Sequence, residues 1–166
     1  WGHFGFARVG ILKTLGLIIS SYFLYIGITL IISLVSIYNN IKIPGYQIQE
    51  SVLPIFGTDI LGLIVAGIAI VLLAPVIEEI LFRGFLLRTL ANKIGIIWGS
   101  VVSALIFALL HVPWQSIIPI FILGLILNSI VIRSKSLWPA IGFHILNNSI
   151  TFVIQILIEK DVISLV

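Results

Sequence analysis

The chain has 166 residues, of which 60% are hydrophobic and only 9% are charged. A water-soluble domain of this size needs a charged surface, so the composition excludes an ordinary soluble fold and indicates that lipid surrounds much of the chain. The net charge of +3 could signal a nucleic-acid partner, but membrane topology explains it better, and we expect no nucleic-acid binding. The absence of cysteine excludes disulfides and thiolate chemistry.

Five uncharged runs follow one another, each close to the roughly 20 residues that cross a bilayer. They cover residues 14–41, 60–77, 94–110, 112–132 and, with His144 neutral, 136–158. Because lipid offers the backbone no hydrogen bonds, continuous apolar runs predict helices. The expected fold is all-α, a polytopic transmembrane helix bundle of about five spans plus an interfacial helix segment.

In chain order, we expect a first span over residues 11–38 and an outer loop over 39–59. As a single helix, segment 60–92 would be about 50 Å long, whereas the hydrocarbon core is ~30 Å thick. We therefore predict a kink at Pro75 and an interfacial path for the part after Arg83. The remaining spans are predicted at 96–112, 115–132 and 137–158. Gly95 and Gly99 form a GxxxG pattern, which is a weak indication of close helix contact.

Basic residues gather on alternate connections between the expected spans, which indicates the orientation. They are Arg8 and Lys13, Arg88 and Lys93, and Arg133 and Lys135. The positive-inside rule then predicts a multi-pass protein with a cytoplasmic N-terminus. Its Ile-rich usage favours a prokaryotic cell membrane. The chain has no methionine, even at position 1, so we expect it to begin inside a longer precursor.

Ionisable residues inside spans are energetically costly and mark candidate functional sites. The stretch PVIEEILFRG, residues 75–84, holds Glu78, Glu79 and Arg83. On a helix, Glu79 and Arg83 are one turn apart in the favourable order for an ion pair, while Glu78 lies about 100° around the axis. We therefore assign the supporting role to Glu79–Arg83 and acid–base chemistry to Glu78. The alternative is an ion-pair clamp in which Arg83 serves both acids and only joins helices.

Two later spans carry further polar residues. His111 closes the sequence FALLH, with Phe107 one turn earlier, where its ring could wall a cavity. His144 and Asn148 are also one turn apart and face the same way, whereas Asn147 points mostly elsewhere. The alternatives are a hydrogen-bonded helix end for His111 and interhelical hydrogen bonding for the His144–Asn148 pair.

Together these groups form the inventory of a hydrolase that acts on a carbonyl. A carboxylate with a histidine can activate water, and a His/Asn pair can stabilise an oxyanion. The sequences EEILFR, FALLH and HILNN match the motifs EExxxR, FxxxH and HxxxN. Their order and their placement on successive apolar segments resemble the CPBP family, which comprises CAAX proteases and bacteriocin-processing enzymes and includes the Ras-converting CAAX endopeptidase. All three motifs are intact.

The resemblance covers roughly residues 60–158 and implies that this region is the catalytic membrane core. Residues 1–59 would then supply an N-terminal span and outer loop, and residues 159–166 a tail. These three parts together form one integral membrane domain.

The resemblance also implies an intramembrane glutamic endopeptidase with no metal and no cofactor. The family's catalytic base falls on Glu78, and the histidine that works with it on water falls on His111. The oxyanion hole falls on His144 and Asn148, and the supporting pair on the second glutamate and the arginine of the first motif. The implied substrates are membrane-associated peptides, either a prenylated tail or a bacterial leader peptide, presented at membrane lipid.

Simple topology places Glu78 in the inner half of its helix and His111 toward the outer end of its own. A shared site needs both within hydrogen-bond reach, directly or through one water. A kink, a tilt or a shallower helix must therefore bring them together, and we expect a cavity near mid-membrane that opens to one face.

Two other functions use the same residues. A zinc-dependent membrane protease could draw ligands from the two histidines and two glutamates, although the sequence has no HExxH and Asn148 is a poor zinc ligand. A non-catalytic scaffold or immunity protein could retain the motifs for stability, but it need not bear the cost of polar groups on three membrane helices. Chelator sensitivity separates the first from metal-independent catalysis, and the effect of Glu78→Ala separates the second.

Overall fold

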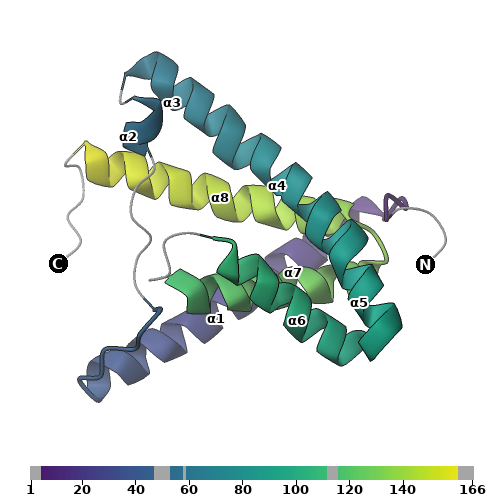
Figure 1. Ribbon diagram of the computed structural model, residues 1–166. Coiled ribbons are helices and arrows are strands. Elements are labelled where there is room, and N and C mark those ends of the chain that lie inside the picture. Colours follow the sequence, from purple (N-terminus) through teal and green to yellow (C-terminus); the bar gives the residue numbers. More distant parts are fainter. Residues whose placement is uncertain (1–4, 47–52, 58, 112–115, 161–166) are drawn as a thin grey trace.

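A computed structural model describes residues 5–46, 53–57, 59–111 and 116–160, and within these ranges it contains helices and no strand (Figure 1). The helical segments are α1 (Ile11–Tyr38), α2 (Leu53–Phe56), α3 (Ile60–Ala66), η1 (Gly67–Leu73), α4 (Ala74–Glu78), η2 (Glu79–Leu86), α5 (Leu87–Ile94), α6 (Ile96–Leu109), α7 (Ile117–Ser134) and α8 (Trp138–Glu159). Four helices in the described ranges are long and apolar enough to cross a membrane, and α6 is a shorter apolar helix. The expected all-α polytopic bundle is confirmed.

The second crossing is one continuous helix of 35 residues from Ile60 to Ile94. It contains two π-helical segments, η1 and η2, on either side of α4. Pro75 lies in the first turn of α4, and in Figure 1 the long helix bends beyond α4. Prolines and π turns are the usual causes of such bends. The irregularity predicted at Pro75 is thus present, while the helix continues through it.

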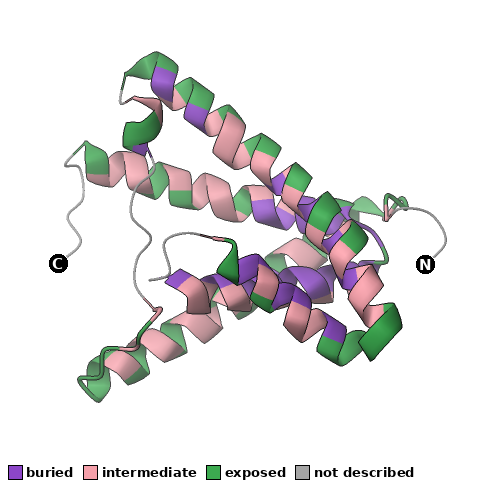
Figure 2. Ribbon diagram, in the orientation of Figure 1, coloured by how far each residue is buried: buried purple, intermediate pink, exposed green. Residues whose placement is uncertain are grey.

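The core forms around α7, whose buried residues contact α1, α6 and α8. A Cβ added at Gly124 would lie 3.1 Å from the Ala104 side chain, so glycine allows α6 and α7 to approach closely. Figure 2 shows buried residues concentrated at the centre of the bundle and exposed residues along its outside. Many exposed residues are large and apolar, for example Leu12 and Phe23, as expected for a surface that faces lipid.

The hairpin between α5 and α6 determines where α6, the second motif-bearing segment, begins. Gly95 has a φ of +81° at the turn, and Gly99 packs against the backbone of Ala91 in α5. Of the predicted GxxxG pair, only Gly99 therefore makes a close helix contact. Helix α6 has only 14 residues, which at 1.5 Å per residue gives about 21 Å, less than the ~30 Å hydrocarbon core.

The loop predicted at 39–59 contains the short helix α2, which the sequence pattern did not indicate. Residues 47–52 and 58 of this loop, and 161–166 of the expected tail, lie outside the described residues.

Candidate active site

Glu79 and Arg83 form an ion pair inside the bundle, with both side chains fully buried. Arg83 Nη1 donates to Glu79 Oε1 at 2.9 Å. Across the helix interface, Arg83 Nε donates to Asn128 Oδ1 at 3.1 Å and Nη2 to the Gly124 carbonyl at 3.2 Å, both on α7. In the described part of the chain, none of the hydrogen bonds of Arg83 goes to Glu78. The arginine thus joins η2 to α7 and neutralises one of the two acids.

Asn128 is a fully buried residue that no sequence motif had singled out. Its Nδ2 donates to the Ser100 carbonyl at 2.9 Å and lies 3.2 Å from Ser100 Oγ, on α6. These contacts turn Oδ1 toward Arg83. The signal that could have found Asn128 is an amide within an otherwise apolar span, since such groups usually hydrogen-bond between membrane helices.

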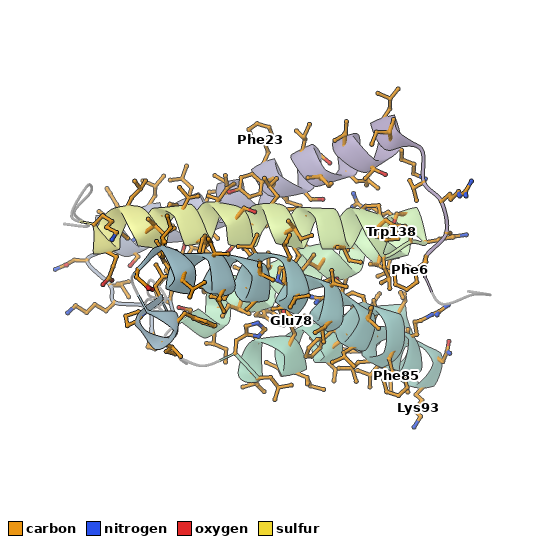
Figure 3. All side chains as sticks on the ribbon, turned by 90° about the horizontal axis from the view of Figure 1, so that it is seen from above. Phe6, Phe23, Glu78, Phe85, Lys93 and Trp138 are labelled. Atoms are coloured by element: carbon orange, nitrogen blue, oxygen red, sulfur yellow. The ribbon has the colours of Figure 1, made fainter. Side chains whose placement is uncertain are left out.

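Glu78 lies on a different side of the helix from Glu79 and lines a cavity of about 1020 Å³. Its side chain is 25% exposed, and its Oε2 lies 3.7 Å from His111 Nε2 and 3.6 Å from His144 Nε2. This oxygen has no hydrogen-bond partner among the described residues. Figure 3 places Glu78 midway along the bundle, far from Lys93 and Trp138 at one end. The mid-depth cavity expected from the sequence is where the first glutamate lies.

Both histidines are oriented by hydrogen bonds from their other ring nitrogen. His111 Nδ1 lies 2.7 Å from the Phe107 carbonyl, which can only accept, so Nδ1 carries the proton. His144 Nδ1 lies 2.9 Å from Glu79 Oε1. Each ring therefore directs Nε2 toward Glu78. The predicted difference in depth between Glu78 and His111 disappears because α6 is short and ends at mid-bundle.

Phe107 does not wall the cavity as expected. Its ring is fully buried, with the Arg83 guanidinium carbon 4.3 Å from its centroid and the His111 ring 4.4 Å away. The ring also packs edge-on against Phe82 of η2, with ring centroids 4.9 Å apart, and edge-on against the His144 ring at 6.0 Å. It packs against the charged arginine, a cation–π geometry, and backs the His111 ring.

Asn148 lines the cavity, and its Nδ2 donates to the Ile70 carbonyl at 3.0 Å. The interhelical alternative therefore describes this contact, which leaves one N–H of the amide for another acceptor. Asn147, expected to point elsewhere, also lines the cavity, because the cavity covers a wide face of α8.

The Ile70 carbonyl is available to Asn148 because of Pro75. In η1 the hydrogen bonds run to the fifth preceding residue, and Ala74 N–H donates to the Ala69 carbonyl. The next donor in this register would be residue 75, but proline has no N–H. The wider turn and the proline together leave a carbonyl for a side chain from α8.

Within the described ranges, no group of three His, Asp or Glu residues is arranged to hold a metal ion. The zinc-dependent alternative is tested by the sensitivity of cleavage to a chelator.

Comparisons with known proteins agree with the motifs. The family model described as "Type II CAAX prenyl endopeptidase Rce1-like" matches residues 60–150. A protein of Bacillus subtilis (strain 168) named "Putative membrane peptidase YdiL" is 24% identical over 85 residues, which are 51% of this chain and 35% of the relative. The matched region thus covers about a third of that relative's length. No solved structure matches the chain. The family model covers more than half of an apolar, multi-helix chain, and this integral membrane protein belongs to the Rce1-like CAAX prenyl endopeptidase family.

Proposed function

We propose that this protein is a metal-independent intramembrane endopeptidase that hydrolyses a peptide bond in a membrane-associated peptide. The family points to membrane CAAX protease activity. One observation carries the proposal of metal-independent hydrolysis: Glu78 Oε2 approaches the Nε2 atoms of His111 and His144 at the cavity wall. Beside a carboxylate and two histidines, one water molecule can be bound and deprotonated.

Glu78 and His111 activate the water. His111 holds its proton on Nδ1 for the Phe107 carbonyl, so the lone pair on Nε2 accepts one hydrogen of the water, and Glu78 accepts the other as a proton. The hydroxide oxygen forms a bond to the peptide carbonyl carbon and leaves a tetrahedral oxyanion. As the C–N bond breaks, the proton on Glu78 passes to the leaving nitrogen. The products are a carboxylic acid and an amine, and no covalent acyl-enzyme forms.

His144 and Asn148 stabilise the oxyanion. Asn148 has one amide N–H left after its bond to Ile70. His144 donates through Nε2 only when Nδ1, held by Glu79, is also protonated. The charges then balance, because Arg83 neutralises Glu79 and the His144 imidazolium opposes the Glu78 carboxylate. Donors fixed in place for such a charge are typically worth 10²–10³-fold each.

The substrate class follows from the family and the membrane setting. We propose a prenylated tail or a bacterial leader peptide, with residues 60–158 as the catalytic core, residues 1–59 as the preceding span and loop, and 159–166 as a tail. The orientation proposed from the basic residues places the N-terminus in the cytoplasm of a prokaryotic cell.

The test compares native membranes that hold matched amounts of wild type, Glu78→Gln or Glu159→Gln, with and without a chelator. Glu159 is the matched control, because it is an exposed carboxylate at the end of α8. Peptide termini are identified by mass spectrometry. Termini that are absent only with Glu78→Gln, and persist with chelator, support the proposal. Termini lost with chelator would show the metal-dependent alternative, and identical termini in all membranes would favour a scaffold.

A further inference from the structure

The cavity extends beyond the glutamate between two rows of polar side chains. One row lies on α8 and the other on α1, and within each row the residues are four positions apart. The α8 row is Asn147, Thr151 and Gln155, and the α1 row is Tyr25, Thr29 and Ser33. Side chains four apart lie on the same helix face, so each helix presents a polar stripe to the cavity. We call the space between these two rows, continued along α8 to His144, the polar trough.

The trough offers hydrogen bonds without charge. No hydrogen bond among the described residues engages the side chains of Asn147, Thr151 or Gln155, so amide donors and acceptors of α8 are available. On α1, Thr29 Oγ1 donates to the Tyr25 carbonyl at 2.9 Å. Ser33 Oγ lies 3.0 Å from the Tyr46 hydroxyl, which itself donates to the Thr29 carbonyl. The α1 hydroxyl oxygens thus keep lone pairs, and this side of the trough accepts hydrogen bonds.

The spacing of the rows matches an extended peptide. Four helical residues advance about 6.0 Å, while two residues of an extended strand advance about 6.6 Å. Every second residue of a strand directs its N–H and C=O to the same edge, so successive members of a row meet successive backbone groups. From His144 to Gln155 the trough runs for roughly 16 Å, enough for about five extended residues.

We infer that the polar trough binds the main chain of an uncharged, extended segment of the substrate, on one side of the bond that is cleaved. A phospholipid headgroup is a poorer occupant, because its phosphate needs a cationic partner and the described lining contains no Lys or Arg. The inference rests on the proposed peptidase function and adds a subsite: about five residues are recognised by their backbone, with wide tolerance for their side chains.

The absence of cysteine in the chain allows a direct test with single-cysteine variants. The protein carries Glu78→Gln, so that peptides bind but are not cleaved, and is held in phosphatidylcholine nanodiscs. Thr151→Cys and Gln155→Cys report on the trough. Val153→Cys is the matched control, since Val153 is 53% exposed on the same helix but does not line the cavity. A water-soluble maleimide should label the two trough positions at least about ten-fold faster than position 153, where lipid limits access and thiolate formation.

Two peptide probes then test what the trough recognises. The first is a library of acetylated, amidated decapeptides of mixed uncharged sequence, and the second is the same library with methylated backbone nitrogens. The first library should slow labelling at positions 151 and 155 by at least about five-fold, and the second should not, because it lacks the N–H donors. Equal protection by both libraries, no protection by either, or equal labelling at position 153 would overturn the inference. Because the assay needs no turnover, it can fail while the termini in native membranes still depend on Glu78, and the reverse also holds.

Discussion

Replacing Pro75 by alanine should separate stability from activity, because the proline acts through a carbonyl that it leaves free. Alanine at position 75 restores a backbone N–H, which in the register of η1 is directed at the Ile70 carbonyl. That N–H competes with Asn148 Nδ2 for the same acceptor. We expect Asn148 to lose its fixed orientation in the cavity.

The change in stability should be small because three contributions offset one another. Proline is about 3 kcal/mol less favourable than alanine inside a helix, so the substitution gains roughly that amount. Loss of the Asn148 hydrogen bond costs about 1 kcal/mol. Pro75 is fully buried, and removing its two outer ring carbons costs about 1.6 kcal/mol at ~0.8 kcal/mol per methylene. The free energy of unfolding should therefore stay within about 1 kcal/mol of wild type.

The rate of cleavage should fall although the fold persists. Removing an oxyanion donor costs about 10²–10³-fold in kcat, and a donor that is displaced but still present should cost at least about ten-fold. The assay is the rate at which the Glu78-dependent termini form, beside thermal unfolding in nanodiscs. Pro139→Ala is the matched control, because Pro139 is a buried proline in the first turn of α8, where the missing N–H has no intrahelical acceptor. Undiminished cleavage by Pro75→Ala, with the fold intact, would refute the reasoning.

Three further substitutions, the last with a matched control, test the site and the bundle. Glu78→Gln should lower the rate of cleavage by at least about 10³-fold with unchanged thermal unfolding, because its side chain lines the cavity. A cleavage rate close to that of wild type would contradict the assigned base. Arg83→Met should destabilise the fold by about 3–5 kcal/mol, because it leaves the buried Glu79 carboxylate without its counter-charge; this is measured as loss of folded protein on heating, and a stable variant would disprove the need for the pair. Gly99→Ala should destabilise the α5–α6 hairpin, because the added Cβ would lie 2.6 Å from a backbone nitrogen of α5. The control Gly16→Ala should be neutral or stabilising by up to about 1 kcal/mol, because no atom lies within 4 Å of its added Cβ. Equal unfolding temperatures for the two variants would contradict the close packing.

The helices themselves could be read from the sequence with little error. Spans were predicted at 11–38 and 137–158, and the structure has Ile11–Tyr38 and Trp138–Glu159. This works because lipid forces each apolar run to satisfy its own backbone, so length and composition determine the element. The end of α6 was placed too late, at residue 112, because apolar composition does not show where a helix stops inside protein.

Local pairs within the candidate site were also readable. The one-turn spacing of Glu79 and Arg83 predicted their ion pair, which the structure contains. The contacts of Asn128 with Arg83 could not be derived, because they depend on how α7 is rotated against η2. The same holds for Tyr25, Thr29 and Ser33, since nothing in the α1 sequence indicates that its polar stripe faces the cavity.

Two adjacent glutamates solve a problem that one carboxylate cannot. The proposed mechanism needs one buried acid that holds His144 by Nδ1 and another that meets water. Glu79 satisfies the first need because Arg83 compensates its charge and is itself held by Asn128 and Gly124. The rotation of about 100° between neighbouring helix positions turns Glu78 away from that network and into the cavity. The buried network that orients the histidine and the open carboxylate that would use it thus begin at consecutive residues, and a disturbance of either helix contact of Arg83 should reach the cavity through His144.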